Sequence, residues 1–329
     1  MEHKKKLIGI GNAAIDAMVE LSSEGDIQHY NLTKGGCVFV GDNDPVMAQM
    51  LSDFPNHFLD AGGAAANALC AYAALGGRAE LIAKTADDDH GKFFKAETEK
   101  CGVIHKTTPT DQSASTFLIA AITPDRERSF LSNHGASHHI ETTDVDESLF
   151  DSNTTLIIDG YMLMSGGGPA AMLKAMEYAK ANDSDIIFMP CSLSVIDSNR
   201  DLIATITKQA NGLICNSDEA LALAQTDDLR QACKILGQSG SYDWGVITLG
   251  GDGAYYFTTD DNGIVPVESP VTHIENTNGA GDNFSGGLIY GLHNGLSLVE
   301  AIKLGHKCAA HVLARKSARC VFNLRSLLD

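Results

Sequence analysis

The stretch that decides the fold is residues 276–291, which read N-T-N-G-A-G-D-N-F-S-G-G-L-I-Y-G. Three small residues at 279–281 lead into Asp282, and the apolar and small residues after it have the spacing of a closely packed helix. The first amides of a helix have no partner within the helix, and the helix dipole there favours negative charge. A helix start without bulky side chains therefore predicts a site for a phosphate group or a developing oxyanion.

Asp282 stands directly beside this predicted anion site. A carboxylate repels phosphate, so it is better suited to accept the proton of a hydroxyl group that attacks phosphorus. The alternative is a glycine-rich turn whose aspartate only caps a helix. A short glycine motif by itself does not separate these two interpretations.

Composition limits the classes of protein that the chain can represent. Its 329 residues can build one large α/β domain, or a core with a smaller appendage. The net charge of −18 argues against a general binder of nucleic acid or acidic membrane, because such binders need a basic face. No signal-peptide core and no run of ~18 apolar residues is present, which predicts a cytoplasmic protein. Eight scattered cysteines without a C-x-x-C motif predict buried free thiols.

The first apolar run provides a rival interpretation. Residues 7–10 read as a strand, and Gly9-x-Gly11-x-x-Ala14 fits the dinucleotide fingerprint G-x-G-x-x-A. That fingerprint would indicate an NAD-linked oxidoreductase. It requires a helix to follow, whereas residues 17–21 favour a second strand.

Two kinds of strand pattern predict two sheets. From residue 155 onward strands and helices alternate, which is typical of a mostly parallel sheet with helices on both faces. Ligands then bind at the carboxyl ends of the strands, where Asn216, Gly250 and the turn before Asp282 fall. Residues 116–123 and 127–131 flank Pro-Asp-Arg and predict a hairpin, which we assign with 17–21 and 34–40 to a small second sheet.

Several ordered motifs together resemble one known family. N-T-N-G-A-G-D-N-F at 276–284 resembles the D-T-x-G-A-G-D-x-F signature of the ribokinase (PfkB) family of sugar and nucleoside kinases. G-N-A-A-I-D at 11–16, G-G-A-A-A-N at 62–67, N-S-D-E at 216–219 and V-I-T-L-G-G-D-G at 246–253 are similar to further motifs of that family. The segment R-S-F-L at 128–131 resembles a stretch of adenosine kinases. The resemblance spans residues 7 to 320.

The resemblance implies a three-layer ribokinase-like α/β fold, with a mostly parallel central sheet, helices on both faces and a small β-sheet lid. Residues 1–15, 42–105 and 132–329 would form the nucleotide-binding core. Residues 16–41 and 106–131 would form the discontinuous lid. The protein would be a monomer, or a homodimer formed through the lid.

The same resemblance implies roles for individual residues. The amides of Gly279, Ala280 and Gly281 would form the anion hole, and Asp282 would be the catalytic base. The substrate-binding set would be Asn12, Asp16, Gly62, Gly63, Asn67 and Arg128. A nucleoside kinase should stack the base on an aromatic ring, and we add Phe39 for that reason.

For the nucleotide, the resemblance implies ATP with Mg²⁺. Glu219 would hold the magnesium through water, because magnesium retains several waters; the alternative is a helix capped by Ser217 with Glu219 near its dipole. The other nucleotide-binding candidates are Asn216, Thr248, Gly250, Gly253, Asn278, His306 and Ala309. Two departures stand out. Asn276 replaces the family's aspartate, which places activation by a monovalent cation in doubt, and M-P-C-S-L-S at 189–194 replaces a D-P-N-x-R stretch.

We therefore expect an ATP-dependent kinase that transfers the γ-phosphoryl group to a hydroxymethyl group of a small-molecule sugar or nucleoside. Neither nucleic acid nor membrane is an expected partner. Two alternatives stay open at this point. One is the NAD-linked oxidoreductase, and the other is a protein of the kinase fold that binds a ligand without chemistry.

Overall fold

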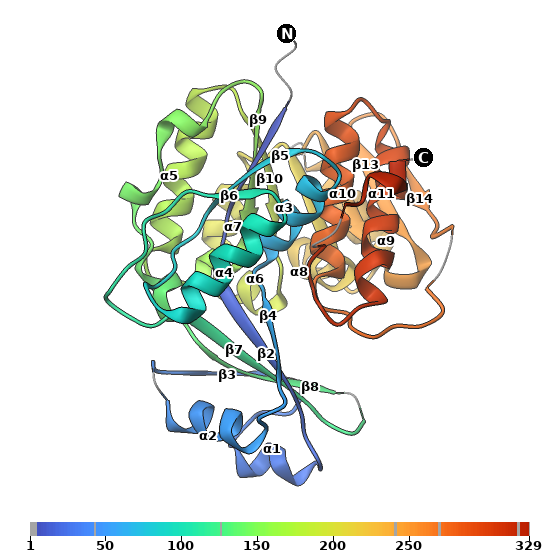
Figure 1. Ribbon diagram of the computed structural model, residues 1–329. Helices are drawn as coiled ribbons and strands as arrows, with labels where there is room; N and C mark the ends of the chain where they lie inside the picture. The colour runs from blue at the N-terminus through green and yellow to red at the C-terminus, as the bar shows by residue number, and fades with distance from the viewer. Residues whose placement is uncertain are drawn as a thin grey trace.

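The computed structural model describes residues 5–42, 44–125, 127–239, 242–268, 271–320 and 323–328. Within these residues the strands form two sheets, one of nine strands and one of five. The larger sheet and its helices form the main body of the molecule, and the smaller sheet projects from it (Figure 1).

The larger sheet has the order β14-β13-β12-β11-β10-β9-β1-β5-β6. The strands from β12 to β6 in this order run parallel to one another, whereas β13 is antiparallel to β12 and β14 is antiparallel to β13. Strands near the middle are buried on both faces, which is why they read as continuous apolar runs. The strands are β1 (Lys6–Ile10), β5 (Arg78–Ile82), β6 (Val103–His105), β9 (Thr154–Asp159), β10 (Asp185–Met189), β11 (Gly212–Asn216), β12 (Trp244–Thr248), β13 (Ala254–Thr258) and β14 (Asn262–Val265).

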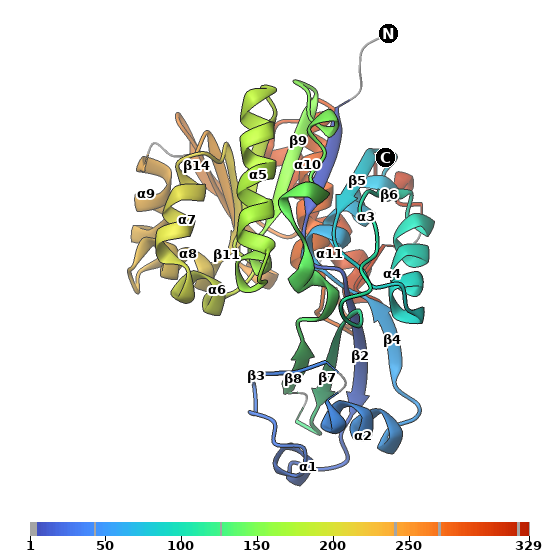
Figure 2. The ribbon, with the colours of Figure 1, turned by 90° about the vertical axis from the view of Figure 1, so that its left-hand side faces the viewer.

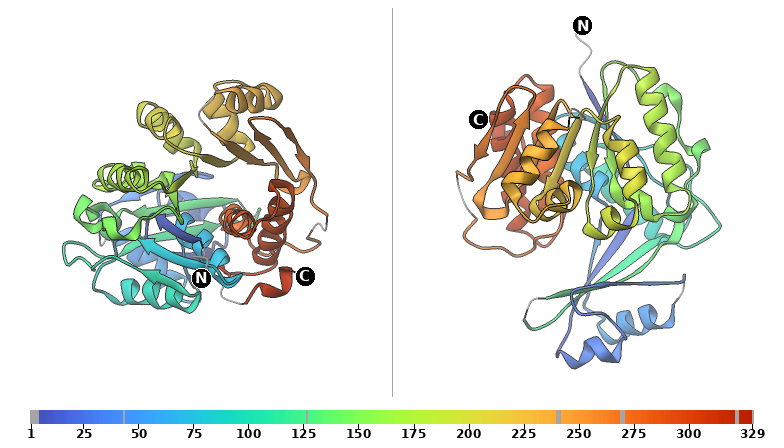
Figure 3. Two further views of the ribbon diagram at one scale, coloured as in Figure 1. Left: turned by 90° about the horizontal axis from the view of Figure 1, so that it is seen from above. Right: turned by 180° about the vertical axis from the view of Figure 1, so that it is seen from behind.

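Helices cover both faces of this sheet, and each face has its own hydrophobic core. Figures 2 and 3 show the two layers on opposite sides. One layer consists of α3 (Ala64–Ala74), α4 (Asp89–Lys100), α10 (Ala280–His293) and α11 (Leu298–Leu313). The other consists of α5 (Gly168–Ala181), α6 (Leu193–Ser198), α7 (Arg200–Thr207), α8 (Ser217–Ala224) and α9 (Leu229–Gln238).

The smaller sheet has the order β3-β8-β7-β2-β4. Side chains alternate along its strands, so Ile15 and Ala17 of β2 pack into a hydrophobic cluster while Asp16 and Met18 point to the opposite face. The short helices α1 (Gly25–His29) and α2 (Pro45–Asp53) lie at the far end of this sheet (Figure 2). The strands are β2 (Ala14–Glu20), β3 (Cys37–Val40), β4 (Phe58–Ala61), β7 (Thr116–Ile122) and β8 (Arg128–Asn133).

The predicted architecture is confirmed: a mostly parallel sheet carries helices on both faces, and a smaller sheet is attached. The expected hairpin is present as the antiparallel pair β7 and β8, although residue 126 in its turn lies outside the described residues. The fragment from Gly9 to Ala14 joins strand β1 to strand β2. The dinucleotide interpretation therefore fails, since no helix start follows that could bind a pyrophosphate.

The sequence predicts no strand at the position of β4. It pairs antiparallel with β2, with Asp16 opposite Asp60, so it belongs to the smaller sheet. The predicted core segment 42–105 includes this strand. The division of the chain into a core and a lid stays a proposal.

Two further observations concern thiols and membranes. All eight cysteines are free, but Cys37 is exposed and Cys191 is only partly buried, so the prediction of buried thiols fails at these two positions. No helix among the described residues has the length and apolar character required to cross a bilayer.

Candidate active site

The start of helix α10 is free of bulky side chains, as the sequence predicted. Gly279 caps the helix with φ 74°, a left-handed conformation that favours glycine. A Cβ atom at Gly279 would collide with the carbonyl oxygen of Ala318, whereas a Cβ at Gly281 would meet no atom within 4 Å. One side of the turn is thus packed against the chain and the other faces open space. This geometry suits an anion held by the backbone amides of residues 279–281.

Asp282 lies in the first turn of α10 and is only partly buried. Burial raises its pKa to about 7, and the carboxylates of Asp159, Glu219 and Asp16 act in the same direction. One hydrogen bond opposes this rise: Asn67 donates from Nδ2 to Asp282 Oδ2 over 2.9 Å. A carboxyl group with a pKa near neutrality can both accept and release a proton at physiological pH.

Two glycines before helix α3 bring the substrate-binding candidates together. Gly63 has φ 99°, and a Cβ there would collide with the carbonyl oxygen of Asn12. A Cβ at Gly62 would collide with the carboxylate of Asp16. The glycine pair therefore permits Asn12, Asp16 and the start of α3 to approach closely.

Asp16 projects from β2 on the face that carries Met18. Burial raises its pKa to about 7; the neighbouring Asp60 raises it further and Arg319 lowers it. Asp60 is itself occupied, because it accepts hydrogen bonds from Ser317 Oγ at 3.0 Å and from the Ala318 amide at 2.7 Å. Of this pair, Asp16 is therefore the carboxylate that we expect to bind a ligand.

Two further acids act electrostatically on Asp282. Asp159 is fully buried at the end of β9, and Glu219 is buried in the first turn of α8. Asn216 caps α8, accepting from the Glu219 amide at 2.9 Å, while Glu219 accepts from the Asn216 amide and side chain at 3.1 and 2.9 Å. The cap is therefore Asn216 rather than Ser217. Burial raises the pKa of Glu219 to about 6.

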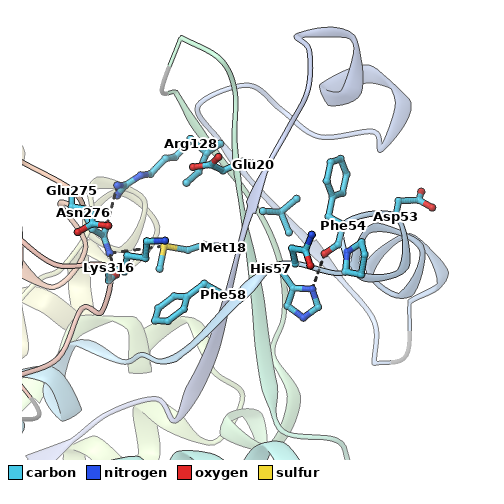
Figure 4. Close-up of a pocket in the computed structure, with 14 residues that line it drawn as sticks. Met18, Glu20, Asp53, Phe54, His57, Phe58, Arg128, Glu275, Asn276 and Lys316 are labelled. Carbon is cyan, nitrogen blue, oxygen red and sulfur yellow. Dashed lines mark hydrogen bonds between the residues drawn. The ribbon is translucent and has the colours of Figure 1, made fainter.

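Arg128 links the smaller sheet to the loop that precedes the anion site. Its guanidinium donates to Thr277 Oγ1 and to Asn276 Oδ1, each over 2.9 Å, and also to Asn278 Oδ1. Figure 4 shows the arginine reaching across from the smaller sheet to Asn276. We predicted Arg128 as a phosphate or substrate ligand; in this structure its donors are directed at the loop.

Phe39 lies at the edge strand β3 of the smaller sheet, with half of its surface exposed. Its ring stacks on His134, with centroids 4.5 Å apart and planes 4° from parallel. This pair forms a flat aromatic surface at the edge of the smaller sheet. Such a surface can bind a planar base.

A cavity of about 520 Å³ opens between the smaller sheet and the loop near Asn276 (Figure 4). It lies along the face of β2 that also carries Asp16, but its lining does not include Asp282. This cavity therefore does not include the predicted catalytic base. The side chains that line it and lie nearest the loop are Met18, Glu20, Phe58, Arg128, Glu275, Asn276 and Lys316.

The nucleotide-binding candidates lie around the ends of β11 and β12 and on α11. Thr248 ends β12, and Gly253 adopts φ 108° where a Cβ would collide with the carbonyl oxygen of Val265. His306 on α11 packs against Phe284 at 5.3 Å between ring centroids, and Ala309 is partly buried. Neither ring nitrogen of His306 has a hydrogen-bond partner among the described residues. That leaves polar capacity for a ligand, although the roles of all these residues stay predictions.

Two residues of the site were missed by the sequence reasoning. Asp159 ends a predicted strand at the edge where ligands bind, and its position was the available signal. Arg319 lies fully buried near the end of the chain and contacts Asn67, and no sequence pattern marks it.

A bare helix start with an adjacent carboxylate, at the carboxyl edge of a parallel sheet and beneath a small second sheet, defines the ribokinase-like class of phosphotransferases. Residues 43–322 match the pfkB family of carbohydrate kinases. The chain belongs to this family and is a kinase that transfers a phosphoryl group to an alcohol.

Relatives of known activity have different substrates. The chain is 26% identical to a 5-dehydro-2-deoxygluconokinase of Bacillus subtilis over 78% of this chain and 82% of that protein. It is also 26% identical to an adenosine kinase of Saccharomyces cerevisiae, over 92% of this chain and 93% of that protein. The identity therefore shows the family without selecting a substrate.

Solved structures confirm the fold. An adenosine kinase from Sinorhizobium meliloti superimposes with a TM-score of 0.89 at 24% identity, covering 99% of each chain. A probable sugar kinase from Rhizobium etli gives a TM-score of 0.88 at 23% identity, covering 98% of this chain and 97% of that one. An aminoimidazole riboside kinase from Salmonella enterica, bound to its riboside and an ATP analogue, gives 0.77 at 23% identity, covering 98% of this chain and 100% of that one.

Proposed function

We propose that the protein is an ATP-dependent kinase that phosphorylates a hydroxymethyl group of a nucleoside or sugar, with Asp282 as the catalytic base. The observation that carries the proposal is the placement of Asp282. Its carboxyl group lies beside the bare start of α10, has a pKa of about 7 and lies within electrostatic range of Asp16, the candidate polyol ligand. The proposed base and the proposed substrate ligand thus lie close enough for the charge of one to affect the other.

The reaction follows from this placement. Asp16 accepts hydrogen bonds from two ring hydroxyls and fixes the acceptor, since a carboxylate has lone pairs for both. Asp282 takes the proton as the hydroxyl oxygen bonds to the γ-phosphorus and the bond to ADP breaks. The amides of residues 279–281 stabilise the negative charge on the transferring group. Closure of the smaller sheet over the acceptor would exclude water and limit wasteful hydrolysis of ATP.

Magnesium fits the charge distribution of the site. The carboxylates of Asp159 and Glu219 both raise the pKa of Asp282, so the cleft has an excess of negative charge. Mg²⁺, held near Glu219 through water, would neutralise phosphate charge when ATP binds. Asn216 orients the Glu219 carboxylate through both of its oxygens, and each oxygen still has a lone pair for a metal-bound water.

A nucleoside is the substrate class that the smaller sheet favours. The stacked rings of Phe39 and His134 offer a planar surface beside the cleft, and burial together with the nearby His138 lowers the pKa of His134, which favours its neutral form. A neutral imidazole and a phenyl ring suit a heteroaromatic base better than a charged sugar acid. ADP release measured across nucleosides, pentoses, hexoses and sugar acids tests this. If no compound in the panel were turned over, the proposal of a kinase for small polyols would be contradicted.

Potassium is expected to leave the rate essentially unchanged. Asn276 is buried, donates from Nδ2 to the Lys316 carbonyl at 2.6 Å and accepts from the Asn278 amide at 3.0 Å. The Asn276 amide thus occupies the Lys316 carbonyl, and because it is neutral it supplies no negative charge to a cation. Initial rates in potassium, sodium and tetramethylammonium chloride at equal ionic strength check this. A large stimulation specific to potassium would contradict it, and Asn276→Asp provides the comparison in which dependence on the cation should appear.

A further inference from the structure

The buried side chain of Arg319 connects three parts of the site. It is 1% exposed, and its guanidinium lies over the ring of Phe94 at 4.8 Å. Nε donates to Asn67 Oδ1 at 3.0 Å, Nη1 to Thr98 Oγ1 at 2.9 Å and Nη2 to the Gly62 carbonyl at 2.6 Å. All three partners lie on α3, α4 or the turn before α3.

The bond to Asn67 determines which way its amide group points. A guanidinium can only donate hydrogen bonds, so the atom of Asn67 that faces Arg319 must be the carbonyl oxygen. The NH₂ group is then directed to the other side, where it donates to Asp282 Oδ2 at 2.9 Å. If the amide rotated by half a turn, an oxygen would face the carboxylate and a donor would face the arginine, and both hydrogen bonds would be lost.

The loop that carries Arg319 is itself fixed. Asp60 on β4 accepts hydrogen bonds from the Ser317 hydroxyl and the Ala318 amide. The bond from Arg319 to the Gly62 carbonyl holds the turn that packs against the carboxylate of Asp16. The Arg319 side chain thereby contacts Asn67, which donates to Asp282, and also Gly62, which packs against Asp16.

We propose that Arg319 is a positioning residue of this kinase: it orients the amide of Asn67 toward Asp282 and holds Gly62 beside Asp16. The proposal rests on the proposed function, in which Asp282 is the base. It goes beyond that function because it assigns a task to a residue that touches neither the acceptor nor the nucleotide.

Arg319→Lys is the direct test. Lysine retains the positive charge but lacks the planar fork that reaches three acceptors. We expect kcat to fall roughly 10²-fold, because a small misplacement of catalytic groups has an effect of that size. The KM for the acceptor should rise while the KM for ATP stays near the wild-type value. The acid limb of kcat should move upward by about one pH unit, as the carboxylate loses a hydrogen bond that favours its ionised form.

The groups that face Asp282 from the surrounding elements are unchanged in this variant, so the shift reports the loss of orientation. They are Asp16 on β2, Asp159 at the end of β9, Tyr161 after β9, Cys191 after β10 and Glu219 on α8.

Thr98→Val is the matched control. It removes another buried partner of Arg319 and leaves the bond to Asn67 intact. Its thermal stability should fall while kcat and the acid limb stay near wild type. Equal kinetic losses in Thr98→Val and Arg319→Lys would overturn the proposal, because the arginine would then have only a structural role. The proposal would also be overturned if Arg319→Lys had the kcat and pH profile of the wild-type protein.

Coupling to Asn67 provides a second test. If Arg319 acts through Asn67, the double variant Asn67→Ala with Arg319→Lys should have nearly the kcat of Asn67→Ala alone. Multiplying losses would contradict that route. If Arg319→Lys does not fold, the wild-type protein provides the test. The side-chain amide resonances of Asn67 should shift as Asp282 titrates. Amide resonances that do not change with pH would overturn the proposal. Activity retained in Asp282→Asn would instead reject the proposed function.

Discussion

Replacement of Asp282 by asparagine is expected to lower kcat by about 10²–10⁴-fold, the range that a general base contributes. Asparagine has nearly the same shape and can still accept the hydrogen bond from Asn67, but it cannot take a proton from the acceptor hydroxyl. The backbone amides of residues 279–281 are unaffected, so the Kd for ATP should stay within a few-fold of wild type. Steady-state ADP release and calorimetric titration with ATP measure the two quantities.

Stability separates loss of the base from loss of the fold. The pKa of Asp282 is higher in the fold than its ordinary value, so ionising the group costs folding free energy as pH rises through about 7. The asparagine variant has no such cost and should unfold at pH 8 no more easily than wild type. Glu300→Gln, in the first turn of the neighbouring α11, is a matched control that should retain full activity. Substantial activity in Asp282→Asn would refute the assignment of the base.

Replacement of Asp16 by alanine is expected to raise the KM for the acceptor by roughly 100-fold, since two hydrogen bonds to a charged group are lost. The variant retains Asp282 and the anion site, so kcat at saturating acceptor should change much less than KM. The carboxylate of Asp16 packs against Gly62, and its removal leaves that turn in place because Arg319 holds the Gly62 carbonyl. Initial rates over a wide range of acceptor concentrations check this.

Glu20→Gln is the control for Asp16, because Glu20 lies on the same face of β2 at the far end of the strand. Its KM for the acceptor should equal that of wild type. If Asp16→Ala also left KM unchanged, Asp16 would not be the ligand of the polyol.

Much of the fold could be predicted because its strongest signals are local. Strands such as β9 and β10 are buried apolar runs, and helices follow them at regular intervals. Strand β4 could not be predicted, for the opposite reason. Its partner β2 lies some forty residues earlier in the chain, and a four-residue strand carries too little pattern to reveal a distant partner.

In the candidate site, too, local features could be predicted from the sequence, whereas contacts between distant residues could not. Gly63 and Gly279 mark turns because their backbone conformations favour glycine, and that requirement can be read from the sequence. The role of Asn67 at Asp282 could not be read, because 215 residues separate the two. Arg319 lies 252 residues from Asn67, and only the packed structure brings them together.

The pH dependence of phosphoryl transfer tests the central claim most directly. In a single turnover at saturating ATP and acceptor, the rate reports the chemical step and therefore the ionisation of the base. We predict a rate that falls tenfold per pH unit as pH is lowered below the pKa of Asp282, which burial raises above the ordinary carboxyl value. A rate that stays constant as pH is lowered from 8 to about 5.5 would contradict the account, since a protonated Asp282 has no capacity to accept the proton of the hydroxyl.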